Sequence, residues 1–218
     1  MIASGSIQSV RLGQPTQLRD GVMTGYRKVP VEGPVAVGTL GLEGDVQVNK
    51  RFHGGPEKAV YGYPVSGYAG WQAEYPALGQ QFVPGAMGEN LPVIGQDEAS
   101  LCIGDIIRCG TALLQVAQIR EPCSTFSAIH GTARVARAMT RSGRCGWYYR
   151  VLEPGVIAAG DAHDVVERWH PDWPVARLAT IATGKAGTRD ALAELAQLKG
   201  LTPAWQRRAA EMLERQTP

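Results

Sequence analysis

The sequence predicts a mainly β protein, a distorted barrel with peripheral helices, followed by a small unit of three helices. In the first two-thirds of the chain, glycine and proline separate short apolar runs, as they do between short strands. Beyond residue 174 the apolar residues recur at helical spacing instead. Many short antiparallel strands in a chain of 218 residues tend to close on themselves. This favours a barrel over a sandwich, although the pattern alone does not separate the two.

Four segments of the body are expected to form strands or hairpins. Residues 6–12 alternate weakly between apolar and polar, and residues 35–42 form a strand that ends at the 41–45 turn. Glycine-containing dipeptides between apolar runs predict two hairpins. The first hairpin pairs 105–108 with 112–118, and the second pairs 155–159 with 163–167.

Two helices are expected to interrupt the strands. Residues 64–75 carry Tyr68 and Trp71 three positions apart, and residues 132–140 carry apolar side chains at i and i+4. Both spacings place apolar residues on one face of a helix. These segments are therefore the expected peripheral helices of the barrel.

The tail begins at the proline-containing segment 169–174, which predicts a linker. We therefore expect a barrel domain at residues 1–170 and a three-helix domain at residues 174–218. Thr188 and Thr202 are N-cap candidates for the second and third helices of the tail. The expected helices are 175–183, 189–199 and 203–215.

Charge and composition argue against several classes of protein. The 22 basic and 20 acidic residues leave a net charge of +2, so neither nucleic acid nor a membrane is an expected partner. The start of the chain lacks the charged and apolar regions of a signal peptide, and no apolar run approaches the ~20 residues that span a bilayer. None of the four cysteines forms a C-x-x-C pair, so we expect a cytoplasmic protein with reduced thiols.

The first candidate site lies in two adjacent glycine-rich stretches, residues 41–45 and 50–58. Glycines let a backbone approach a ligand closely, and neighbouring N–H groups can form an anion-binding nest. Lys50 and Arg51 add positive charge for a phosphate, with His53 close by in the sequence. A surface turn with solvated charges explains the same residues and remains the alternative.

Two further stretches each leave two interpretations open. In 85–91, Glu89 and Asn90 could fix the edge of a heterocycle, or they could brace the loop for local reasons. The stretch 141–151 combines basic and aromatic residues. It is equally compatible with a turn that enters a strand and with a pocket wall near a phosphate. Cys145 lies in this stretch and could be exposed.

Cys123 is the candidate for a reactive side chain. It follows a predicted strand, and Pro122 stiffens the backbone immediately before it. Arg120, if it lies close in space, would favour the thiolate, a soft ligand suited to a redox metal. The alternative is a small buried hydrophobe. That is the role we expect for Cys102 and Cys109 in their apolar surroundings.

Five motifs in this order resemble the MOSC domain (molybdenum cofactor sulfurase C-terminal domain), in its YiiM-like branch. The resemblance runs from about residue 5 to the C-terminus, and the three-helix tail is similar to the 3-alpha domain of that branch. The motifs are Gly-Leu-Glu-Gly-Asp at 41–45, His-Gly-Gly-Pro at 53–56, Gly-Glu-Asn-Leu at 88–91, Arg-x-Pro-Cys at 120–123 and Gly-Trp-Tyr-Tyr-Arg-Val-Leu-x-x-Gly at 146–155.

The resemblance implies a MOSC-type β-barrel that holds the molybdenum cofactor, molybdopterin-bound molybdenum. Cys123 maps onto the family cysteine that ligates the metal, and it is the expected catalytic residue. The activity implied by the resemblance does not depend on pyridoxal phosphate. The residues expected to bind the cofactor are Lys50, Arg51, His53, Gly54, Gly55, Glu89, Asn90 and Arg120.

The activity that the resemblance implies is the reduction, and so the detoxification, of N-hydroxylated compounds such as 6-hydroxylaminopurine. The chain has no flavin or nicotinamide fingerprint, so a separate, flavoprotein-type reductase is the expected electron donor. A homodimer is left open. The chain departs from the family pattern at Ile119, where the family has proline, and at Ser124 and Thr125, where it has an aromatic and a basic residue. These departures bear on the substrate more than on the metal ligand.

Two other functions stay open. The chain could hold molybdopterin as a carrier or sensor without turnover, which the Ser124 and Thr125 departures favour slightly. The three tail helices could also imitate a helix-turn-helix regulator. The near-neutral charge argues against this last function, because DNA binding depends on neutralising phosphates.

Overall fold

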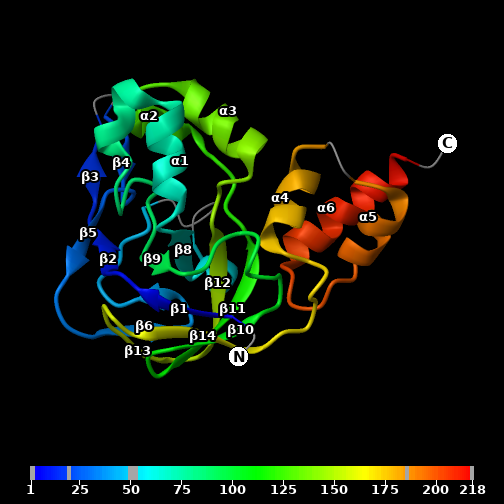
Figure 1. Cartoon of the computed structure of the whole chain (residues 1–218), viewed down its shortest axis with the longest axis horizontal. Helices are drawn as coiled ribbons and strands as arrows, with labels where there is room; N and C mark the ends of the chain where they lie inside the picture. The colour runs from blue at the N-terminus through cyan, green and yellow to red at the C-terminus, as the bar shows by residue number, and fades with distance from the viewer. Residues whose placement is uncertain (1–2, 19–20, 49–53, 185–186, 217–218) are drawn as a thin grey trace.

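A closed barrel of seven strands forms the body of the protein in this computed structural model, which describes residues 3–18, 21–48, 54–184 and 187–216 (Figure 1). In the order in which they pair, the strands are β1 (Ser4–Ile7), β14 (Ala162–Glu167), β10 (Ile106–Cys109), β11 (Ala112–Ile119), β12 (Trp147–Glu153), β8 (Val60–Pro64) and β9 (Leu91–Ile94). Pairing of β9 with β1 closes the barrel. Neighbouring strands are antiparallel except β8 and β9. The predicted mainly β barrel is confirmed.

Helices cover one end of the barrel and form a second group beside it (Figure 1). Those over the end are α1 (Gly67–Glu74), α2 (Ser124–Ile129) and α3 (Ala133–Ser142), and those beside it are α4 (Val175–Ala182), α5 (Arg189–Leu195) and α6 (Pro203–Glu214). In α1, Tyr68 and Trp71 are buried as their spacing requires. The helix starts later than predicted because Pro64 ends a barrel strand. None of the described helices is long and apolar enough to cross a membrane.

Three small sheets flank the barrel and correct three predictions. Their strands are β13 (Gly155–Ile157) with β6 (Val35–Gly38) and β7 (Gly41–Leu42), β2 (Val10–Gly13) with β5 (Lys28–Val31), and β3 (Thr16–Gln17) with β4 (Met23–Thr24). The predicted strand 6–12 is divided between β1 and β2, and 35–42 is a hairpin of β6 and β7. The predicted hairpin 155–167 does not form. Because His163 and Val165 are buried in the barrel, β14 pairs with β1 and β10, while β13 pairs with β6.

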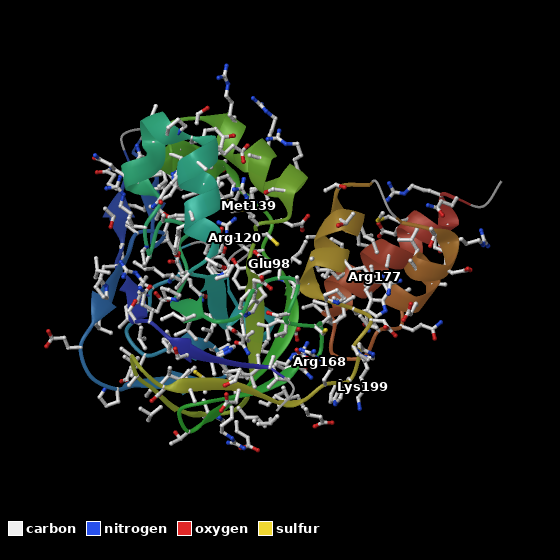
Figure 2. The ribbon with its side chains drawn as sticks, in the orientation of Figure 1. Glu98, Arg120, Met139, Arg168, Arg177 and Lys199 are labelled. Atoms are coloured by element: carbon white, nitrogen blue, oxygen red, sulfur yellow. The ribbon has the colours of Figure 1, made fainter. Side chains whose placement is uncertain are left out.

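The C-terminal helices are joined to the barrel at several points. Trp173, before α4, is 1% exposed, and the backbone N–H of Thr202, before α6, donates to the carbonyl oxygen of Ala117 in β11 (3.2 Å). Arg168 lies at the junction between the barrel and these helices (Figure 2), where it pairs with the buried Asp105 at 2.6 Å. The division of the chain into two domains at this junction stays a prediction.

A buried histidine gives the fold a pH dependence. His163 is fully buried, and its ring nitrogens contact Gln96 Oε1 and, at 2.7 Å, the Tyr149 hydroxyl. The amide oxygen only accepts, so Nδ1–H donates to it and Nε2 accepts from Tyr149, which only the neutral ring allows. Burial lowers the pKa of His163 to about 4, so the unfolded chain binds this proton first as pH falls. We expect the free energy of unfolding to drop between about pH 6.5, the unfolded-state pKa, and pH 4.

The variant His163→Gln isolates this effect. The free energy of unfolding of both proteins is measured with urea at about pH 7.5 and at about pH 4.5. Between these two pH values, the wild type should lose about 2 to 3 kcal/mol more of this free energy than the variant loses. Burial also lowers the pKa of His130, but that residue is present in both proteins and its contribution cancels. Equal losses in the two proteins would contradict the prediction.

Candidate functional site

A cavity of about 610 Å³ opens where β8, β11 and β12 meet the N-terminal segments and α6. Three lining residues form one row across the barrel wall, because Gln118 of β11 pairs with Tyr148 of β12, which pairs with Tyr61 of β8. Trp147 and Tyr149, the neighbours of Tyr148, point into the barrel core and are fully buried. The alternation of β12 therefore places one tyrosine in the cavity and two aromatic residues in the core.

Cys123 reaches the cavity through the end of β11. The strand stops at Ile119, and Pro122 holds the backbone extended up to Cys123, which has φ −125° and ψ 173° and precedes the first turn of α2. The thiol is half-buried and lines the cavity. Cys123 thus lies shortly after the end of a strand, as the sequence predicts.

Arg120 is a buried cation beside this thiol. Its side chain is 3% exposed, and Figure 2 shows it in the interior between the barrel and the helices above. Nη2 lies 3.8 Å from Cys123 Sγ, and Nη1 donates to the carbonyl oxygen of Glu121 (2.6 Å). Nearby positive charge favours a thiolate, so the proximity that the sequence left conditional is present.

Aromatic rings hold Arg120 in place. Its guanidinium carbon lies 5.7 Å from the ring centre of Tyr26, 5.6 Å from that of Tyr61 and 5.5 Å from that of Phe126. Cation–π contacts of this kind orient a guanidinium without neutralising it. Among the described residues, no carboxylate forms an ion pair with Arg120, and its buried Nε–H has no hydrogen-bond acceptor. The wall of the cavity therefore contains an oriented positive charge that no described carboxylate neutralises.

A second charged group is built from residues of three segments. Lys28 Nζ lies 2.5 Å from Asp45 Oδ1, and both side chains are almost completely buried. Asn90 Nδ2 donates to Asp45 Oδ2 (3.0 Å), and its Oδ1 accepts from the backbone N–H of Tyr61 (3.1 Å). Lys28 and Asn90 line the cavity, whereas Asp45 lies behind them. Burial lowers the pKa of Lys28, and the adjacent Asp45 carboxylate opposes that shift.

Glu89 lies behind the cavity wall and does not line it. Its carboxylate accepts hydrogen bonds from the Tyr68 hydroxyl, from the backbone N–H of Gly85 and, at 3.0 Å, from that of Met87. Burial raises its pKa. Gly88 in this loop has φ +77°, and a Cβ there would lie 2.9 Å from the Tyr26 ring. These contacts are those of a loop brace, while a contact of Glu89 with a cofactor stays a prediction.

The glycine-rich stretch is described only in part. Lys50, Arg51 and His53 lie outside the described residues. Gly54 and Gly55 are described and do not line the cavity. They precede η1 (Pro56–Lys58), the short 3-10 helix whose last residue, Lys58, does line it. Burial lowers the pKa of Lys58. This lysine belonged to a candidate stretch but was not selected as a site residue.

The other cysteines differ from Cys123 in their surroundings. Cys102 and Cys109 are buried as expected, and burial raises the pKa of Cys102 to about 11 and that of Cys109 to about 12. Cys145, whose exposure the sequence left open, is 3% exposed, because it packs beneath the 119–122 segment. Among the described residues, no three histidine, cysteine or acidic side chains come together as a metal site.

The basic residues of 141–151 do not line the cavity. Arg144 pairs with Glu74 of α1, and Arg150 pairs with Glu57 of η1. From this stretch the cavity receives Tyr148 alone. At this cavity the pocket-wall interpretation therefore holds for Tyr148 only, while Arg141 and Arg144 line a separate pocket of about 270 Å³.

Several lining residues had no signal in the sequence. Tyr26 and Lys28 belong to an N-terminal segment without a recognisable motif, and Trp205 and Arg208 belong to the distant α6. The alternation of β12 could have selected Tyr148, because strand neighbours face opposite sides. The other four are brought to the cavity by tertiary packing only.

Comparison with known proteins gives consistent matches. The model of the MOSC domain matches residues 49–164. Protein YiiM of Escherichia coli (strain K12) is 35% identical over 206 residues, 94% of this chain and 88% of that protein. A protein of Gibberella moniliformis named Reductase is 35% identical over 168 residues, 77% of this chain but 30% of that protein. The crystal structure of YiiM from Geobacillus stearothermophilus has a TM-score of 0.81 and 32% identity, covering 96% of this chain and 99% of that one.

Proposed function

Because the chain belongs to the MOSC domain family, we propose that it is a molybdenum-cofactor-dependent reductase of N-hydroxylated compounds. The observation that carries the proposal is the half-buried Cys123 thiol, 3.8 Å from the buried Arg120 guanidinium in a cavity of about 610 Å³. The similarity to a fungal protein named Reductase supports the reaction type. That relative is much longer than this chain, so the activity of the whole relative is not assigned to this chain.

The described residues fit a pterin-bound molybdenum. A cysteine thiolate is a soft ligand of the kind that redox metals accept, and the sulfur atoms of the pterin would supply further ligands to the metal. Arg120, Lys28 and Lys58 line the cavity and would offer donors to the cofactor's phosphate. The cavity volume lies in the range of small-molecule and cofactor sites, roughly 300 to 1,000 Å³.

The proposed reaction converts R–NH–OH, two electrons and two protons into R–NH₂ and water, with cleavage of the N–O bond. When bound, the cofactor supplies the two-electron redox chemistry that side chains lack. Arg120 and Lys28 would hold the anionic end of the cofactor, and the lining tyrosines Tyr26, Tyr61 and Tyr148 would exclude water. Burial raises the pKa of Tyr148, so its phenol keeps its proton at neutral pH and can donate to an oxygen in the cavity. The electrons come from a separate reductase.

Protein produced in a host that makes the cofactor provides the test. We expect molybdenum by elemental analysis, pterin by fluorescence, and reduction of 6-hydroxylaminopurine when a reduced artificial donor is supplied. A preparation from such a host that contains neither molybdenum nor pterin would overturn the proposal.

A second candidate is a carrier that holds the cofactor without turnover. Ser124 and Thr125 both line the cavity, where the family pattern has an aromatic and a basic residue. A serine and a threonine at these positions offer fewer binding contacts to a substrate than an aromatic and a basic residue would. The two functions separate in the same assay, because a carrier contains molybdenum and pterin but shows no steady-state reduction.

A further inference from the structure

We propose that Gln118 and Tyr148 form a pair of hydrogen-bond donors that binds the oxygen atom of the substrate's N–OH group, and that Thr202 of the tail orients the Gln118 amide for this role. The inference rests on the proposed function and assigns the residues that recognise the bond to be cleaved. Its starting observation is that both side chains line the cavity, and that each keeps a donor which no described residue occupies.

The register of the barrel places the two donors side by side. Gln118 of β11 is the direct cross-strand partner of Tyr148 of β12, and both line the cavity, so they project from the same face of the sheet. The Cβ atoms of directly opposed residues lie about 5 Å apart, so one small group of a ligand can contact both side chains. Burial raises the pKa of Tyr148, which the nearby Arg120 lowers and the nearby Cys123 raises further. The pair therefore lies within electrostatic reach of the thiol.

Tyr148 differs from the other two tyrosines of the cavity in its hydroxyl group. The hydroxyl of Tyr26 donates to the carbonyl oxygen of Ala86 (3.2 Å). The hydroxyl of Tyr61 donates to the carbonyl oxygen of Cys145 (2.8 Å). Among the residues that the structure describes, the Tyr148 hydroxyl has no hydrogen-bond partner. Of the three phenols, it is therefore the one available to a ligand.

The ring of Tyr148 is nevertheless fixed in direction. It packs on the ring of Tyr61, with 5.1 Å between the ring centres and 38° between the planes. Its neighbours in β12, Trp147 and Tyr149, are fully buried, so the strand cannot turn to carry Tyr148 away from the cavity. A phenol held by its ring and free at its hydroxyl is a preorganised donor.

The tail fixes the orientation of the Gln118 amide. Gln118 is 5% exposed, and its Oε1 accepts a hydrogen bond from the hydroxyl of Thr202 (3.0 Å). An amide carries its acceptor on one side and its two N–H donors on the other, so this bond turns Nε2 away from Thr202. Within the described part of the chain, Nε2 has no acceptor. Its donors are therefore available to a ligand in the cavity that Gln118 lines.

The hydroxyl of Thr202 is not used by its own helix. Thr202 is the N-cap of α6, a position where a threonine side chain usually accepts a hydrogen bond from the first turn. Thr188 does so at α5, where it accepts from the backbone N–H of Ala191 (3.3 Å). The side chain of Thr202 makes no such bond and contacts Gln118 instead. Departures from local rules of this kind concentrate at functional sites, which supports the assignment.

Two neutral donors suit the oxygen atom of an N–OH group. This oxygen carries lone pairs and gains electron density as the N–O bond breaks, so donors directed at it stabilise the charge that develops. The amine product lacks the oxygen and cannot use the pair. We therefore expect the pair to favour binding of the N-hydroxylated compound over its own product.

The test compares two ligands that differ by one oxygen atom, 6-hydroxylaminopurine and adenine. Isothermal titration into the cofactor-loaded protein, with no electron donor present, measures binding without turnover. Tyr148→Phe removes only the hydroxyl, and Gln118→Met removes the amide at a similar volume. Each should weaken binding of 6-hydroxylaminopurine by about 2- to 10-fold, the equivalent of one hydrogen bond, and leave adenine binding unchanged. Molybdenum and pterin content should stay at the wild-type level.

Thr202 is tested as a positioning residue. Thr202→Val removes the hydroxyl at nearly constant shape and should shift the ratio of the two dissociation constants in the same direction as Gln118→Met. Thr202→Ser keeps the hydroxyl and should keep the wild-type ratio, whereas a purely structural role would not change this ratio in either variant. Tyr75→Phe is the matched control, because Tyr75 lies outside the cavity and its hydroxyl donates to the carbonyl oxygen of Arg134 (3.2 Å).

Two results overturn the inference. The first is an unchanged ratio of dissociation constants in Tyr148→Phe, which keeps the ring and its packing and so remains decisive if Gln118→Met does not fold. The second is a loss of molybdenum and pterin with an unchanged ratio, which would assign the donors to the cofactor.

A failure of the proposed function is distinguishable from a failure of this inference. Wild-type protein that lacks molybdenum contradicts the proposed function, whatever the donor pair does. The same titrations into the cofactor-free protein then test the pair directly. A preference for 6-hydroxylaminopurine over adenine that is lost in Tyr148→Phe and kept in Tyr75→Phe supports the inference, and the absence of a preference in the wild type overturns it.

Discussion

Cys123→Ser is expected to lose reduction of 6-hydroxylaminopurine by more than about 100-fold and to lose most of its molybdenum. The substitution exchanges one atom, so the backbone of the 119–124 segment should be preserved. A serine hydroxyl is a hard, neutral group at pH 7 and does not replace a soft thiolate. Loss of a residue that only orients a metal ligand already costs roughly 10- to 100-fold, so loss of the ligand itself should cost more.

Cys102→Ser is the matched control for this prediction. Cys102 is a buried cysteine outside the cavity, and its Sγ lies 3.6 Å from the carbonyl oxygen of Pro171, which a serine can also reach. Activity and molybdenum content should stay at the wild-type level in this variant. Full activity in Cys123→Ser, with thermal unfolding like that of the wild type, would refute the assignment of Cys123.

Local patterns predicted much of this fold. The hairpin of β10 and β11 and the helices α4 and α6 were found because their signals lie within short stretches of sequence. The hairpin at 155–167 was wrong because a turn signal shows where a chain reverses, not which strands pair afterwards. Closure of the barrel depends on β1 with β9, strands more than 80 residues apart. Such a pairing leaves no local pattern in the sequence.

The candidate site likewise contains residues that local motifs predict and residues that only the tertiary structure brings together. Arg120, Cys123 and Asn90 were selected from motifs, and all three line one cavity. Glu89, from the same motif as Asn90, is turned away, because a pair of adjacent residues rarely faces one side. Tyr26 and Trp205 come from opposite ends of the chain. Their contribution requires the tertiary structure, which explains why the specificity of the site could not be predicted from the motifs around Cys123.

Arg120→Met is expected to weaken cofactor retention by about 10- to 150-fold, the equivalent of one charge-assisted hydrogen bond. Methionine fills a similar volume and keeps contact with the rings of Tyr26, Tyr61 and Phe126. It removes the positive charge and the hydrogen-bond donors of a guanidinium that lines the cavity. The measurement is the molybdenum and pterin content of protein purified under identical conditions.

The stability of the same variant decides between a binding role and a structural one. Removing one partner of a buried ion pair costs about 3 to 5 kcal/mol, because the other charge is left buried and unpaired. No described carboxylate is paired with Arg120, so the substitution Arg120→Met leaves no buried carboxylate without its partner. We therefore expect the free energy of unfolding of the cofactor-free protein to stay within about 1 kcal/mol of the wild type.

Arg168→Met should give the opposite pair of results. Arg168 lies outside the cavity and pairs with Asp105, whose side chain is fully buried, at 2.6 Å. Its removal leaves that carboxylate unpaired, so stability should fall by about 3 kcal/mol while cofactor content is retained. If Arg120→Met instead lost stability and kept the cofactor, Arg120 would be a structural residue like Arg168. A buried arginine that can be removed without loss of stability, but not without loss of ligand, is one that the fold positions for binding.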